Sequence, residues 1–129
     1  MTEGSDVGTD GIWSYRPGSG HREGLDLTGF RVEATDGIIG HVDRQADDTP
    51  QRHLIVDTGA WVFGRSLVIP AGTVTGVDER ERTVTVACTR ADAKEAPRFE
   101  TDRETRDPRY LAAVGAYHAR LSHASQASG

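Results

Sequence analysis

A chain of 129 residues has the size of one domain, and its net charge of −5 argues against binding nucleic acid or an anionic membrane through a general electrostatic field. Hydrophobic residues make up only 36% of the chain and glycine accounts for 15 residues, which predicts a small core with polar or flexible ends. The only cysteine, Cys88, cannot form an internal disulfide, and we expect it to pack as a small buried hydrophobe.

The composition also bears on location. No apolar run approaches the ~20 residues that a membrane span needs. The first residues are acidic and rich in glycine, without the cationic and apolar regions of a signal peptide. We therefore expect a cytoplasmic protein without a membrane span.

Residues 1–24 are predicted to form a flexible N-terminal arm, disordered as far as about residue 11. Trp13 and Tyr15 lie in an otherwise turn-rich segment of this arm. Because an exposed tryptophan is costly without a partner, we favour an arm that docks on the domain over one that projects freely.

Residues 25–97 show the pattern of a small β domain, in which short alternating runs are separated by turn residues. Six such runs without a long intervening helix predict an all-β fold, a small six-stranded antiparallel barrel with short C-terminal helices. The predicted strands are residues 30–34, 38–45, 52–59, 65–71, 73–78 and 82–88.

The first two predicted strands form a hairpin. Asp36 and Gly37 lie between them, and this dipeptide readily adopts the positive φ angles of a type I′ turn. Simple alternation then places Ile38, Gly40 and Val42 on one face of the second strand, and Ile39, His41 and Asp43 on the other. We interpret Asp36 as a corner residue, without a role in chemistry.

Two strands break the simple alternation, because residues 54–56 (LIV) and 67–69 (LVI) are apolar on both faces. Such strands are usually covered on both sides. The inside of the barrel covers one face, so a second chain or another segment of this chain has to cover the other.

Residues 98–129 supply one candidate cover: a charged connector, then an amphipathic helix with a frayed tail. Asp107 and Pro108 form a good helix start, with an N-cap followed by proline in the first turn. Tyr110, Val114, Tyr117 and Leu121 follow at steps of 4, 3 and 4, which places them on one stripe. Gly115 weakens the helix by about 1 kcal/mol relative to alanine, so we expect it to need docking.

A metal site is the only chemistry with a spatial argument. His41, Asp43 and His53 share one face if Asp43 and His53 are cross-strand neighbours, but no compact ligand motif accompanies them. The sequence contains no G-x-S-x-G elbow and no phosphate-binding glycine loop. We therefore predict no enzyme activity, no catalytic residues and no cofactor, and keep the metal as a minor alternative.

The strand order and motifs resemble the PRC-barrel family, named for the cytoplasmic domain of the photosynthetic reaction-centre H subunit. The resembling segments are LTGFRVEATDGIIGHVD (27–43), LIVDTGAWVFGRSLVIPAGTVTGVD (54–78) and VTVACTRADAKEAP (84–97). The chain is most similar to the small stand-alone PRC-barrel proteins of actinobacteria. The resemblance implies a six-stranded barrel, often dimeric, that binds other macromolecules, and it implies no catalytic residues.

These observations favour a non-enzymatic protein-interaction module that forms a homodimer or binds an unidentified protein partner. The alternative is a small-molecule or metal-binding protein that uses the face of His41, Asp43 and His53. The residues we expect at the interface are the apolar ones of the doubly apolar strands, their connecting turn and the last helix: Leu54, Ile55, Trp61, Phe63, Val68, Ile69, Tyr110, Val114, Tyr117 and Leu121.

Overall fold

The computed structural model describes residues 11–47, 49–59, 66–97 and 105–128, with side chains described as far as Leu121. Residues 1–10 of the expected arm and the expected connector 98–104 lie outside this part. The elements in chain order are β1 (Arg31–Ala34), β2 (Gly37–Ala46), β3 (His53–Asp57), β4 (Ser66–Pro70), the 3₁₀ turn η2 (Ala71–Thr73), β5 (Val74–Asp78), β6 (Thr83–Val86), α1 (Arg90–Glu95) and α2 (Pro108–Ser128).

All six predicted strands are confirmed, and they form one β-rich sheet in the order β4-β3-β2-β1-β6-β5. The pairing of β1 with β6 is parallel, with Val32 opposite Val84, whereas the other four pairings are antiparallel. Among the described strands no ladder joins β4 to β5. The expected closed, all-antiparallel barrel is therefore wrong: the sheet is mixed and open.

The parallel pair follows from the way β4 leads into β5. Both strands run antiparallel to β1, so the chain keeps its direction through the single turn η2 instead of reversing. When β6 then returns from β5, it runs in the same sense as β1 and pairs with it in parallel. An all-antiparallel barrel would need a reversing turn between β4 and β5.

The sheet is strongly curved, because β4 and β5 are its two edges and yet only three residues separate them in the chain. Four residues of extended chain span at most about 14 Å, so the two edges must approach each other where η2 connects them. Inside this curve lies one apolar core, made by Leu27, Phe30, Val32, Ala34, Ile39, Val42, Leu54, Val56, Leu67, Ile69, Val74, Val84, Val86, Cys88 and Ala93.

An irregularity in the pairing of β1 with β2 changes the faces predicted for β2. The register shifts between Val32 and Glu33, so that Ile39 is an extra residue between the partners Gly40 and Ile38. Ile39 is consequently buried in the core, while Ile38 is 48% exposed. The predicted shared face of Ile38, Gly40 and Val42 is wrong for Ile38.

The turn between β1 and β2 is where we predicted it, but its geometry differs. Ala34 pairs with Gly37, so the two loop residues are Thr35 and Asp36, neither of which has a positive φ angle. The type I′ turn centred on Asp36 and Gly37 is therefore wrong. Asp36 is also more than a corner, because its Oδ1 accepts a hydrogen bond from Arg90 N at the start of α1.

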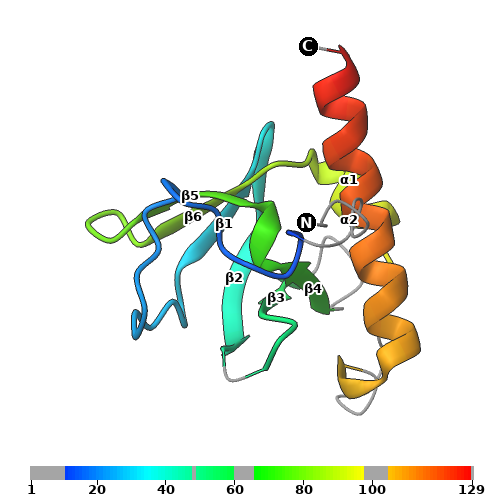
Figure 1. Ribbon diagram of the computed structural model, residues 1–129. Coiled ribbons are helices and arrows are strands. Elements are labelled where there is room, and N and C mark those ends of the chain that lie inside the picture. Colours follow the sequence, from blue (N-terminus) through cyan, green and yellow to red (C-terminus); the bar gives the residue numbers. More distant parts are fainter. Residues whose placement is uncertain (1–10, 48, 60–65, 98–104, 129) are drawn as a thin grey trace.

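Both helices begin at a capping residue, and the second of these caps was predicted. Thr89 and Asp92 form a reciprocal capping box at α1. Arg109 N donates to Asp107 Oδ1 at the start of α2, which confirms the predicted cap. α2 runs along one side of the sheet (Figure 1) and continues to Ser128, where we had expected a frayed tail. No helix in the described ranges is long and apolar enough to cross a membrane.

Candidate functional site

The outer faces of β3 and β4 are covered within one chain. Ile55 and Val68 point away from the core and pack in a second apolar cluster, which we call the outer cluster. Its other members come from α2, the candidate cover that we expected, and from the N-terminal arm. The outer cluster contains Ile12, Trp13, Ile55, Val68, Leu111 and Val114, with Tyr110 packed against it.

Trp13 connects the arm, the sheet and α2. Its ring meets His53 edge to face, with 6.2 Å between ring centroids, and it lies against Gly115 of α2. A Cβ atom at Gly115 would come within 2.9 Å of Trp13 Cζ2, so only glycine leaves room for the indole ring. The docked arm that we favoured is confirmed for Ile12 and Trp13, which are both buried.

Two tyrosine hydroxyls fix the position of α2. Tyr110 Oη donates to Pro97 O at 3.1 Å, and Tyr117 Oη donates to Asp92 O of α1 at 2.7 Å. These two side chains are only partly buried, as is Leu121, whereas Val114 is fully buried. The predicted stripe therefore runs along one border of the buried face, and we missed Leu111 and His118, which lie at its centre.

His118 is the unusual residue of this face, since only 2% of it is exposed and neither ring nitrogen has a hydrogen-bond partner in the described chain. Its ring contacts Tyr117 edge to face, with 5.3 Å between centroids. Burial lowers the pKa of His118 to about 4, although the nearby charge of Asp92 favours the protonated form. The neutral ring therefore packs as an apolar group at pH 7.

The remaining predicted interface residues divide between the two clusters. Leu54 and Ile69 point into the main core, whereas Ile55 and Val68 belong to the outer cluster. All four are buried within one chain, so a second chain reaches Ile55 and Val68 only if α2 or the arm moves away. Trp61 and Phe63 lie outside the described residues.

The metal alternative depended on Asp43 lying opposite His53, and this pairing is wrong. His53 pairs with Ala46, and a second register shift between Val42 and Arg44 leaves Asp43 without a partner in the ladder. His41 pairs with Asp57 and is exposed, five residues along β2 from Ala46, or roughly 17 Å. No three metal-ligating side chains gather anywhere in the described chain.

A groove of about 490 Å³ opens where the β2–β3 hairpin meets the start of α2. Of the described residues that line it, Arg44 and Arg106 are charged and none is acidic. Ile55 and Leu111 also line it, although they are only 4% and 5% exposed. The described residues that line it are Arg44, Gln45, Ala46, Thr49, Gln51, His53, Ile55, Thr105, Arg106 and Leu111.

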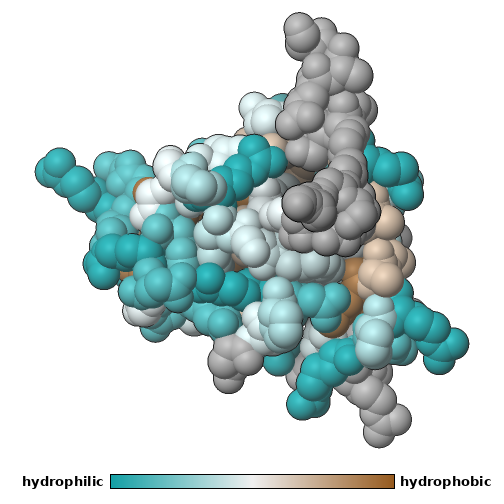
Figure 2. Space-filling view, in the orientation of Figure 1, coloured by the Kyte–Doolittle hydropathy of each residue, from teal (hydrophilic) through white to brown (hydrophobic). Residues whose placement is uncertain are grey.

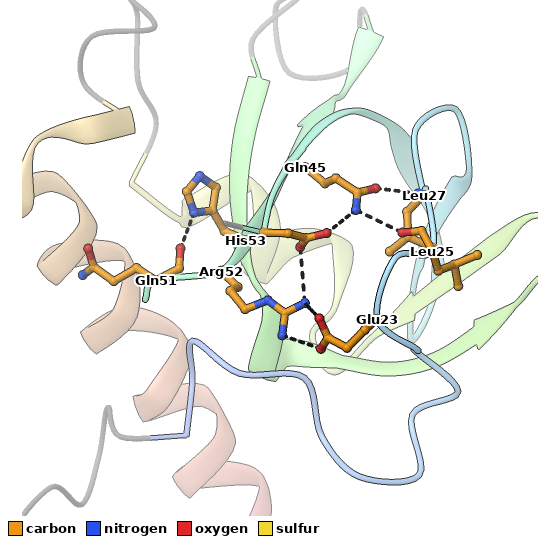
Figure 3. A network of polar contacts seen from close by, with 8 residues as sticks. Glu23, Leu25, Leu27, Gln45, Gln51, Arg52 and His53 are labelled. Carbon is orange, nitrogen blue, oxygen red and sulfur yellow. Dashed lines mark hydrogen bonds and ion pairs between the residues drawn. The ribbon is translucent and has the colours of Figure 1, made fainter. Parts of the chain in front are cut away.

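A polar network beside the groove holds the arm against the hairpin (Figure 3). Arg52 makes two hydrogen bonds to Glu23, at 3.0 and 3.3 Å, and its guanidinium lies 5.0 Å from the ring of Tyr15. Gln45 donates to Leu25 O and accepts from Leu27 N. The Tyr15 ring stacks on His21 at 3.6 Å, and burial raises the pKa of the Tyr15 hydroxyl.

The surface of the molecule has a small hydrophobic area. Figure 2 shows hydrophobic residues gathered in a narrow area beside α2, while most of the remaining face is hydrophilic. Cys88 is buried, and burial raises the pKa of its thiol to about 12, so it stays protonated and unreactive.

Neither the family models nor the curated proteins compared with this chain give a match.

Proposed function

We propose that the chain is a non-enzymatic interaction module, related to the PRC-barrel proteins, that works through α2 and the outer face of β3 and β4. The observation that carries this proposal is the outer cluster. Ile55 and Val68 need an apolar cover, and part of the cover comes from one helix joined to the sheet domain by a charged segment. A helix attached in this way can be exchanged for the same helix of a second copy.

Self-association is then an exchange of α2 between two chains. In the dimer, Leu111 and Val114 of each α2 would contact the partner's sheet in the same way as they contact their own sheet in the single chain. Such a dimer needs no new apolar surface. This fits the surface of the described residues, where Ile38 is the only large hydrophobic residue that is strongly exposed.

The test is the solution mass of the full chain by light scattering. We expect about 28 kDa, twice the 14.0 kDa of one chain. Ile55→Asp places a carboxylate in the outer cluster and should give a monomer or an unfolded chain. Ile38→Asp is the matched control at an exposed position and should remain a dimer. A 14 kDa wild type, or a folded dimer carrying Ile55→Asp, would overturn the exchange.

A further inference from the structure

The groove beside α2 has a charge opposite to that of the molecule. Its two guanidinium groups lie in a chain of net charge −5, and among the described residues that line it none carries a carboxylate. Arg44 is already paired with Asp43, with 3.2 Å between Nε and Oδ2. Arg106 is exposed and makes no ion pair within the described part of the chain, so its charge is available to a ligand.

His53 supplies a hydrogen-bond acceptor to the same groove. The residue is 5% exposed, and its Nδ1 lies 2.7 Å from Gln51 O. Because a carbonyl oxygen only accepts, Nδ1 carries the hydrogen and Nε2 is left with a lone pair. Burial lowers the pKa of His53 and keeps this tautomer neutral. No hydrogen bond within the described chain uses Nε2, so it keeps its capacity to accept one from a ligand.

The third feature is an apolar floor. Ile55 and Leu111 line the groove next to Ala46, although most of each larger side chain is buried in the outer cluster. The groove therefore combines one available positive charge, one acceptor and a small apolar surface, within a volume of about 490 Å³. That volume lies in the range typical of small-molecule sites.

We propose that this groove binds a monocarboxylate that carries an apolar side group and one N–H or O–H donor. The carboxylate pairs with the Arg106 guanidinium, the donor bonds His53 Nε2, and the apolar group lies on Ile55 and Leu111. An N-acylated apolar amino acid and the C-terminal residue of a peptide both have this chemistry. The site does not depend on whether α2 exchanges between chains.

The probe is N-acetyl-leucine, titrated into the ¹⁵N-labelled full chain and followed by NMR. We expect saturable shifts at His53, Ile55 and Leu111, with a Kd on the order of 1 mM. N-acetyl-leucinamide keeps the side chain and the donor but lacks the charge, and should bind roughly tenfold more weakly. A peptide ending in leucine that binds roughly tenfold more tightly than the probe assigns the site to protein C-termini, and equal binding assigns it to free acids.

Arg106→Gln removes the charge and should weaken binding by roughly tenfold. Arg109→Gln is the matched control, since Arg109 is also exposed at the start of α2 but does not line the groove. It should change the Kd by less than about twofold. The proposal is wrong if no shift saturates, if the amide binds as well as the acid, or if Arg106→Gln binds like the wild type. An unchanged NMR spectrum of the free variant shows that it is folded.

Discussion

Gly115 lies under the indole ring of Trp13, and the three nearest atoms to a Cβ atom at this position all belong to that ring, at 2.9 to 3.2 Å. Helix propensity alone makes an interior glycine a weakness of about 1 kcal/mol, which was our interpretation from the sequence. In the structure the missing side chain is what lets the arm and α2 meet. The residue contributes through the contact that it permits.

Gly115→Ala should therefore lower the free energy of unfolding by about 1 kcal/mol, because overpacking exceeds the gain in helix propensity. The check is urea unfolding of a double-mutant cycle. In a Trp13→Leu background the ring is absent, and the same Gly115→Ala change should stabilise the protein by about 1 kcal/mol. If alanine stabilises both backgrounds, Trp13 does not pack against Gly115 in solution.

We expect the attachment of α2 to depend on the protonation of His118. The ring is buried without a hydrogen-bond partner, and its folded-state pKa of about 4 lies below the ordinary value of 6.5. A proton therefore binds the unfolded or undocked state more strongly than the docked state. The stability that neutral His118 provides is complete above pH 6.5 and is lost as the pH falls toward 4.

Between pH 7.5 and pH 5 we expect His118 to account for a loss of about 2 kcal/mol in unfolding free energy. His118→Leu removes this titration, and its loss over the same range should be smaller by about that amount. His41→Leu, at an exposed position, should leave the wild-type loss unchanged. Denaturant unfolding at the two pH values gives the unfolding free energy of all three proteins. Equal losses for wild type and His118→Leu would mean that the ring is not buried in solution.

The elements themselves could be predicted from local patterns, but their irregularities could not. Alternation and turn residues located all six strands, and Asp107 with Pro108 located the start of α2. The extra residue Ile39 leaves no local signal, because a bulge is decided by the partner strand. On α2, Leu111, Val114 and His118 also lie at steps of 3 and 4. We missed this stripe because His118 is polar.

The whole molecule depends on contacts between segments far apart in the sequence, and here prediction was weakest. Because β3 and β4 are apolar on both faces, we correctly predicted that their outer faces are covered. The groove joins a hairpin to a residue about 60 positions later, Arg106, so no motif spacing could indicate it. The direction of the chain through η2 likewise determines the parallel pair without any strong sequence signal.

The arm holds the curved sheet at the place where its two edges approach. Gly72 of η2 donates its N–H to Ile12 O at 2.7 Å and accepts at its carbonyl from Arg16 Nε at 2.6 Å. Further along, Val77 N of the edge strand β5 donates to Ser19 O at 2.7 Å. These hydrogen bonds satisfy backbone groups of η2 and of the edge strand β5, so the arm replaces part of the pairing that a closed sheet would provide.

Gly72→Ala tests this role, because a Cβ atom there would meet Gly11 O and lie 2.7 Å from Ile12 Cα. Its φ angle is not in the left-handed region, so any effect is steric. We expect a loss of about 1–3 kcal/mol in unfolding free energy. Trypsin cleavage after Arg22 should be faster by roughly tenfold, because the arm would detach from η2 and β5.

Gly76→Ala makes the same change two positions into β5, where the nearest atom to a new Cβ, Thr85 Oγ1, is 3.5 Å away. This contact is ordinary packing, so stability and cleavage should stay close to wild type. If both variants behave alike, the arm contributes nothing to closing the sheet. A specific effect at Gly72 would instead mean that the open edge of this sheet is completed by residues that precede it in the chain.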